Sequence, residues 1–166
     1  MITQERLKEL FTLDEETGKF YWVKDKAPQG WATKEGRAAG FLSDGYNRIK
    51  ADKKSYLAHR LVWLWFYGEF PNSNLDHKDE NKLNNRLDNL RLATGSENIM
   101  NVGLKANNTS GAKGVFWNKS SGKWQVSVTL NGKQYFFGYF KDKDEAIRVS
   151  IAAREKLHGE FCNHGN

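Results

Sequence analysis

Residues 75–92 read LDHKDENKLNNRLDNLRL, and this segment carries the most informative pattern in the chain. It opens on the pair Asp76-His77, continues through polar residues that favour turns, and reaches Asn89. This order predicts a strand that ends at His77, a loop, and a second strand that begins near Asn89. Adjacent side chains of a strand point to opposite faces, so Asp76 and His77 can serve one site only where the strand ends.

The residues after the second expected strand predict a helix. Thr94-Gly95-Ser96-Glu97 has the form of a capping box, in which Thr94 caps the helix and Glu97 bonds back to the cap. Asn98 then falls in the first helical turn, where its amide oxygen can meet a metal ion.

These side chains are the kinds that phosphodiester hydrolysis needs, namely a base for water, ligands for a cation, and orienting groups. Histidine is the side chain whose ordinary pKa lies near neutrality, which suits His77 to take a proton from water. Asn89 is placed to return beside His77 and orient the imidazole. Asp76 and Asn98 form an oxygen pair that suits Mg²⁺ or Mn²⁺ and would bind zinc poorly. The other asparagines of the loop are assigned to loop architecture: Asn81, Asn84 and Asn85.

Local signals predict the elements that precede this segment. Thr3 can cap a short helix with Leu7, Leu10 and Phe11 on one face, and Asp44-Gly45 predicts a tight hairpin turn. The further expected elements are a turn at 14–18, an aromatic strand at 20–22, a loop at 24–36, a strand at 55–58, and a helix at 59–66 that stops at Gly68. His59, beside apolar residues, is interpreted as a packed or capping histidine outside the site.

The C-terminal part predicts a small sheet covered by a helix. Strands are expected at 115–118, 123–130 and 133–140, with Asn131-Gly132 as a tight turn and an acidic helix cap at 142–145. Alternation turns Trp124, Val126 and Val128 towards the helix and leaves a polar, basic opposite face. Four aromatic residues are assigned to the core: Trp117, Tyr135, Phe137 and Phe140.

Composition narrows the class of protein. The net charge is +6, and no acidic residue occurs from Asn98 to Lys141, where lysines alternate with aromatic residues. That pattern favours nucleic acid as a partner over a membrane or an acidic protein. The single cysteine, Cys162, excludes an internal disulfide and a cysteine-rich zinc site. No apolar run is long enough for a bilayer and no signal peptide is evident, so we expect a cytoplasmic protein.

The segment from Asp76 to Asn101 resembles the HNH endonucleases, particularly the phage and intron-encoded homing type. The resemblance implies a ββα-metal fold with His77 as base, Asn89 as the residue that orients it, and Asp76 and Asn98 as metal ligands. Asn98 stands where many relatives have the final histidine of the motif. A phage origin, with the host cytoplasm as location, follows by analogy only. Lys82, Arg86 and Arg91 are candidates to grip flanking phosphates, with an ordinary solvated basic face as the alternative.

Residues 113–161 resemble the plant ethylene-response-factor (APETALA-two) DNA-binding domain. The match rests on Gly114-Val115, Lys123-Trp124, Gly138-Tyr139-Phe140, Glu145-Ala146, Ala152-Ala153 and Leu157-His158-Gly159. It implies that the sheet lies in the major groove of double-stranded DNA, although several positions hold Arg or Trp in the plant domains. The expected contacts, with Lys123 added from its place on the polar face, are Lys113, Phe116, Asn118, Lys119, Lys123, Gln125, Ser127, Thr129, Gln134 and Phe136.

Together these features predict an α+β protein: a ββα-metal nuclease unit, then a three-stranded antiparallel sheet packed on one helix. The expected domains are 1–106 for the nuclease and 113–166 for DNA binding, joined by a linker at 107–112. The expected function is a metal-dependent DNA endonuclease, with no membrane and no obligate protein partner. The alternative is a DNA-binding regulator whose nuclease fold is inactive.

Overall fold

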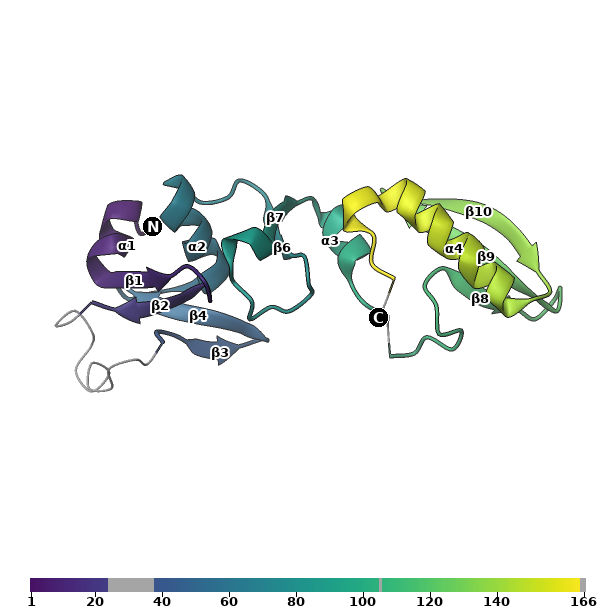
Figure 1. Ribbon diagram of the computed structural model, residues 1–166, viewed down its shortest axis with the longest axis horizontal. Coiled ribbons are helices and arrows are strands. Elements are labelled where there is room, and N and C mark those ends of the chain that lie inside the picture. Colours follow the sequence, from purple (N-terminus) through teal and green to yellow (C-terminus); the bar gives the residue numbers. More distant parts are fainter. Residues whose placement is uncertain (24–37, 105, 165–166) are drawn as a thin grey trace. The chain divides into compact units, whose positions relative to one another are not determined.

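The computed structural model describes residues 1–23, 38–104 and 106–164, and the chain divides into two compact units, Met1–Leu92 and Ala93–Asn166 (Figure 1). This division comes before the expected linker at 107–112. The reason is that Ala93 and Met100 pack with Phe161 in one apolar cluster, which ties the helix α3 (Gly95–Asn101) to the C-terminal unit. The loop expected at 24–36 lies outside the described residues.

The first unit begins with a capped helix and a two-stranded sheet. Helix α1 (Gln4–Leu10) starts at Thr3, whose hydroxyl accepts a hydrogen bond from the Arg6 backbone, as expected. Strand β1 (Phe11–Asp14) follows directly and pairs with β2 (Lys19–Trp22). The assignment of Phe11 to the helix was therefore wrong, because the backbone becomes extended there. Phe11 is nevertheless fully buried, since it packs against Phe20 and Trp22.

A three-stranded antiparallel sheet and a second helix complete the main core of this unit. The sheet has the order β3 (Phe41–Ser43), β4 (Tyr46–Ala51), β5 (Lys54–Leu57), and β3 and β4 turn at Asp44-Gly45 as predicted. Helix α2 (Ala58–Tyr67) follows at once and ends at Gly68 in the left-handed conformation, as expected. The core between these elements is made of apolar side chains that include Leu7, Phe20, Ile49, Leu61, Val62 and Leu64.

Two further strands frame the segment that was expected to carry the site. Strand β6 (Asn74–His77) pairs with β7 (Leu90–Ala93), and the connecting loop ends in the short 3-10 helix η1 (Leu87–Asn89). The strand, loop and second strand predicted from residues 75–92 are confirmed.

The second unit contains the predicted sheet and covering helix. Strands β8 (Val115–Asn118), β9 (Lys123–Leu130) and β10 (Lys133–Phe140) form an antiparallel sheet, followed by α4 (Lys143–His158) and the 3-10 helix η2 (Gly159–Phe161). Val126 and Ala146 are fully buried between sheet and helix. Small residues allow the close approach, because a Cβ on Gly114 would lie 2.7 Å from the Ser127 carbonyl oxygen and 2.9 Å from the Ser150 hydroxyl.

Two of the aromatic residues assigned to the core of this unit are exposed. Trp117 is 49% exposed, although its ring packs edge-on against Trp124. Phe137 is 38% exposed and sits at the register shift between Phe136 and Gly138, where strict alternation fails. Phe140 does pack against the core, as expected.

Candidate active site

Asp76 and His77 are the last two residues of β6, and both are buried. The backbone turns immediately after them: the Glu80 N–H donates to the His77 carbonyl at 3.0 Å, and the Lys78 N–H donates to the Asn89 carbonyl at 2.9 Å. The expectation that both residues lie where the strand ends is confirmed. Within a strand their side chains would point to opposite faces, but at its end both can serve one site.

Asn89 closes the loop that follows. Its side-chain NH₂ donates to Asp79 Oδ1 at 2.9 Å and to the Asn84 carbonyl at 2.8 Å, and its Oδ1 accepts from the Asp79 N–H at 3.2 Å. Burial raises the pKa of Asp79, but hydrogen bonds from Asn84 and Asn89 outweigh it, so the pKa lies below its ordinary value. The Asn89 side chain therefore acts here as a cross-link of the loop.

The amide that contacts the His77 ring belongs to Asn85. Its Oδ1 lies 3.0 Å from His77 Nε2, and the Asn85 residue is only 3% exposed. The expectation that Asn89 would orient the ring and that Asn85 was loop architecture is corrected by this geometry. Asn85 Oδ1 accepts this hydrogen bond in the tautomer that carries its proton on Nε2, and in that tautomer Nδ1 is the nitrogen with the lone pair.

Two more aromatic side chains pack around His77. The His59 ring, from the first turn of α2, meets it edge-on with centroids 5.1 Å apart, and Tyr46 lies 5.5 Å from His59 and 6.2 Å from His77. Burial, together with the charges of His77 and Arg60, lowers the pKa of His59 to about 3. His59 is thus a neutral packed residue, as expected, but its contact with His77 has no signal in the sequence.

Asp76 is held by an arginine from the neighbouring strand. Arg91 Nε and Nη2 both donate to Asp76 Oδ2, at 2.9 and 2.8 Å, and both side chains are largely buried. Arg91 was a candidate phosphate contact. The structure instead pairs it with an intramolecular carboxylate at the end of β6.

Asn98 lies in the first turn of α3, as expected. The capping box is complete: the Thr94 N–H donates to Glu97 Oε2 at 2.7 Å and the Glu97 N–H to Thr94 Oγ1 at 3.2 Å. Asp76 belongs to the first unit and Asn98 to the second, so the pairing of these two residues as metal ligands stays a prediction. Over the described residues, no cluster of three or more His, Cys, Asp or Glu side chains forms a metal cage.

The other two residues proposed as phosphate contacts, Lys82 and Arg86, have different surroundings. Lys82 Nζ lies 4.7 Å from the centroid of the Tyr46 ring, which itself packs near His77. Arg86 forms an exposed pair with Asp88, at 3.1 and 3.0 Å, which raises the pKa of Arg86 and lowers that of Asp88. Exposed pairs of this kind contribute little to stability, so the role of Arg86 as a phosphate contact stays a prediction.

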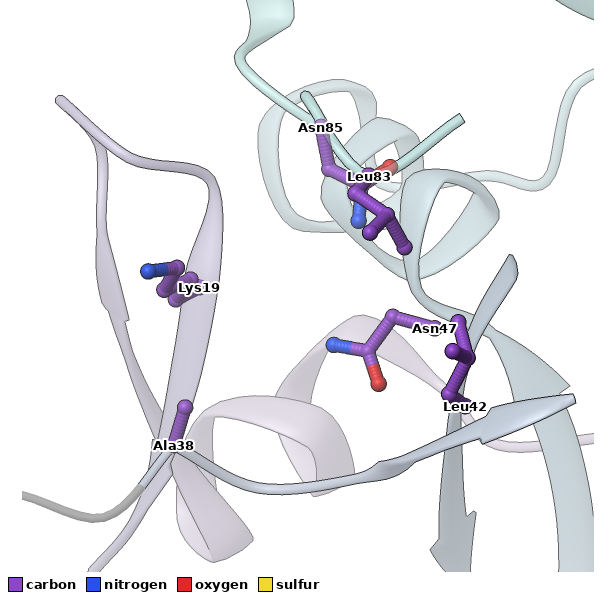
Figure 2. A pocket seen from close by; sticks show the side chains of 6 residues that line it. All are labelled: Lys19, Ala38, Leu42, Asn47, Leu83 and Asn85. Carbon is purple, nitrogen blue, oxygen red and sulfur yellow. The ribbon is translucent and has the colours of Figure 1, made fainter. Parts of the chain in front are cut away.

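A hollow of about 240 Å³ opens beside the loop and is lined by Lys19, Ala38, Leu42, Asn47, Leu83 and Asn85. Figure 2 shows that these side chains come from separate segments, with Asn85 and Leu83 on the loop and Asn47 and Leu42 on the β3–β4 hairpin. Behind Asn85, the β1–β2 turn packs so closely that a Cβ on Gly18 would lie 2.3 Å from the Asn85 carbonyl carbon. Close packing thus fixes the backbone of the residue that holds His77.

The open face of the C-terminal sheet is partly as expected. Phe116 and Phe136 are more than half exposed, the Asn118 amide donates to Gln125 at 3.2 Å, and the Gln134 amide donates to Ser127 at 3.1 Å. Lys119, Thr129 and Gln134 are exposed, Lys123 is half-buried, and Ser127 is buried.

Lys113 does not extend from this face. Its amine donates to the carbonyl oxygens of Met100 and Asn163, at 3.3 and 2.8 Å, which explains why it is partly buried. Tyr139, which the sequence did not single out, joins the face because its ring lies 5.1 Å from that of Phe136. The bulge between Phe136 and Gly138 brings these two residues to the same side.

Known proteins resemble the chain over the region of the site. Residues 56–100, which include all four predicted catalytic and metal-binding residues, match the HNH endonuclease family. Protein 3.8 of Escherichia phage T7 is 40% identical over 117 residues, covering 68% of this chain and 96% of that protein. An uncharacterized HNH endonuclease of Acanthamoeba polyphaga mimivirus is 32% identical over 106 residues, covering 63% of this chain and 54% of that protein.

Among solved structures, the chain is similar to one that describes DNA binding and cleavage by the HNH homing endonuclease I-HmuI. The match covers 90% of this chain and 85% of the I-HmuI chain, with 25% sequence identity and a TM-score of 0.41. The phage T7 protein is matched over nearly its whole length, and the HNH endonuclease match spans the strand end, the loop and the capped helix. The chain belongs to the family of this phage T7 protein and is an HNH endonuclease.

Proposed function

We propose that the protein hydrolyses phosphodiester bonds of double-stranded DNA in the manner of a homing-type nuclease, with His77 as the base that activates water. The observation that carries this proposal is the hydrogen bond between His77 Nε2 and Asn85 Oδ1 at 3.0 Å. It fixes the orientation of the ring of a buried histidine at a strand end. A general base needs such a defined orientation.

In the proposed reaction, the imidazole of His77 takes a proton from water as the water oxygen bonds to phosphorus. The bond from phosphorus to the 3′ oxygen breaks, and that oxygen is protonated from solvent. The products are a 5′-phosphate and a 3′-hydroxyl. Asn85 keeps the ring in register during this step, and the packed rings of His59 and Tyr46 restrict its rotation.

We assign the divalent cation to Asp76 and Asn98. Asp76 is placed for this role because it lies beside His77 at the end of β6. A carboxylate and an amide oxygen suit Mg²⁺ or Mn²⁺. When bound, such an ion supplies charge neutralisation at the phosphoryl and departing oxygens.

We propose that the β8–β10 face contacts the DNA. Its support is the set of amide side chains in hydrogen-bonding position, Asn118, Gln125 and Gln134, beside the exposed rings of Phe116 and Phe136. Amides can pair with base edges, and apolar side chains can contact thymine methyl groups. This role matches the expected ethylene-response-factor-like module and leaves the target sequence open.

One observation favours the alternative of a DNA-binding regulator with an inactive nuclease fold. Arg91 occupies the carboxylate of Asp76, which the metal would need. Under this alternative the protein binds DNA and cleaves none. Separately, no helix of the described part of the chain has the length and apolar character to cross a membrane. A cytoplasmic location and the absence of an obligate protein partner stay predictions.

The test is cleavage of several plasmids by the native protein and by His77→Ala, each with Mg²⁺ and with chelator. We expect the native protein to cut DNA with Mg²⁺ and not with chelator. His77→Ala should cut DNA under neither condition, and both proteins should bind DNA equally. Full cleavage by His77→Ala would remove His77 as the base. Binding without cleavage by the native protein on every DNA would support the regulator.

A further inference from the structure

A second hollow of about 240 Å³ lies in the first unit, and two arginines line it. Arg48 comes from β4 and Arg60 from α2, and the walls also include Ser55, Tyr56 and Phe70. None of the described residues that line the hollow carries a carboxylate. Two guanidinium groups thus share a recess that has no negative charge in its lining.

The hydrogen bonds of these arginines do not neutralise them. Arg48 Nε is buried and has no hydrogen-bond partner, and Arg48 takes part in none of the ion pairs found over the described residues. Arg60 donates to the carbonyl oxygens of Pro71 and Ser73, at 3.0 and 3.4 Å, and its guanidinium lies 6.0 Å from the Phe70 ring centroid. A partly buried cation without a counter-ion is unfavourable, and an anionic ligand removes that cost.

The two arginines are close in the sequence to Tyr46 and His59, whose rings pack around His77. Arg48 is two residues after Tyr46 on β4, so both project from the same face, about 7 Å apart. Arg60 directly follows His59 on α2. Tyr46 and His59 both lie against His77, so each arginine is close in the chain to a residue that contacts this histidine.

We propose that Arg48 and Arg60 bind a phosphate of the DNA backbone that flanks the scissile phosphate. The proposal rests on the proposed nuclease function, to which it adds a substrate contact. Guanidinium groups present planar pairs of donors that match phosphate oxygens, and the hydroxyl of Ser55 adds a further donor. Free inorganic phosphate offers the same oxygens, so the test has to separate the two sources.

The test is the salt dependence of binding to an arbitrary DNA duplex, measured in chelator so that no cleavage occurs. The full chain is compared with Arg48→Gln, with Arg48→Lys, and with the matched control Lys54→Gln, which removes one exposed charge from the paired strand β5. Arg48 is chosen because, over the described part of the chain, its side chain makes no hydrogen bond that the replacement would break. A parallel titration with inorganic phosphate alone follows binding by calorimetry.

We expect Arg48→Gln to weaken DNA binding roughly tenfold and to reduce the slope of log K against log salt by about 0.9, the value for one phosphate contact. Arg48→Lys should restore the slope but only part of the affinity, because a lysine offers a point charge without the planar fork. Lys54→Gln should leave both values unchanged.

An unchanged slope for a folded Arg48→Gln protein would overturn the proposal. So would Arg48-dependent binding of inorganic phosphate with DNA binding unaffected, since that result assigns the recess to a free anion. Because binding is measured without cleavage, the outcome is separable from the nuclease test: an Arg48-dependent slope in a protein that cuts no DNA keeps the phosphate site and removes the catalysis.

Discussion

Acidification from pH 6.5 to 4.5 is expected to destabilise the first unit through His59. The imidazole is 5% exposed and has a pKa of about 3, whereas an unfolded chain binds this proton near pH 6.5. The groups that face it are the Tyr46 and His77 rings, with Arg60 next in sequence. Because the folded pKa is lowered, the unfolded state takes up a proton that the folded state refuses. The stabilising contribution is therefore complete above pH 6.5 and is lost as the pH falls.

The magnitude follows from proton linkage. One proton of difference between the two states changes the free energy of unfolding by about 1.4 kcal/mol per pH unit. Over the two units from pH 6.5 to 4.5, His59 should cost roughly 2 kcal/mol, a substantial part of the 5 to 15 kcal/mol typical of a domain. The aspartates of the first unit whose pKa values are lowered contribute mainly below this window, since their ordinary value is 3.8; they are Asp14, Asp52, Asp79 and Asp88.

The assay is urea unfolding at several pH values, read by pulse proteolysis with the fragments of the first unit identified by mass spectrometry. His59→Gln removes the titrating group and keeps a polar side chain, so its unfolding free energy should vary less with pH than that of the native protein. His164→Gln, in the second unit, is the matched histidine control and should keep the native dependence. Equal pH dependence in the native protein and in His59→Gln would refute the assignment of His59 as a buried neutral residue.

Three substitutions test the loop and strand contacts around the site. Arg91→Ala leaves the buried Asp76 carboxylate without its guanidinium and should lower the free energy of urea unfolding by about 3 kcal/mol or more; an unchanged value would contradict the buried pair. Gly18→Ala places a Cβ against the Asn85 backbone at a positive φ, so we expect a lower melting temperature and slower cleavage per folded molecule, and native behaviour would count against the close packing. Asn89→Ala removes the cross-link of the loop and should speed amide hydrogen exchange over residues 78–88 without unfolding the chain, whereas unchanged exchange would remove its cross-linking role.

The C-terminal unit was predictable from its sequence because its signals are local. The turn Asn131-Gly132, the helix cap Asp142 and the alternation around Val126 each act over a few residues. The observed strands have the expected bounds, and the helix begins at the expected acidic cap. The exposed Trp117 and Phe137 were missed because exposure depends on what covers a residue, and a β-bulge breaks the alternation rule.

The candidate site was only partly predictable, for a related reason. The position of Asp76 and His77 follows from strand periodicity and the polar loop. The contact of Asn85 with His77 depends on the path of the loop, and the Asp76–Arg91 pair on the register of β6 with β7. The contact of His59 with His77 depends on how α2 packs in the unit. The spacing of residues in the sequence does not predict these tertiary contacts.

The central claim is that the imidazole of His77 takes the proton from the attacking water. The most direct measurement is the rate of DNA cleavage by His77→Gly with Mg²⁺, in the absence and presence of added imidazole. Removal of a general base is expected to slow cleavage by about 10² to 10⁴-fold, and imidazole diffusing into the vacated space should restore part of the native rate. Cleavage by His77→Gly at the native rate without imidazole would contradict the claim.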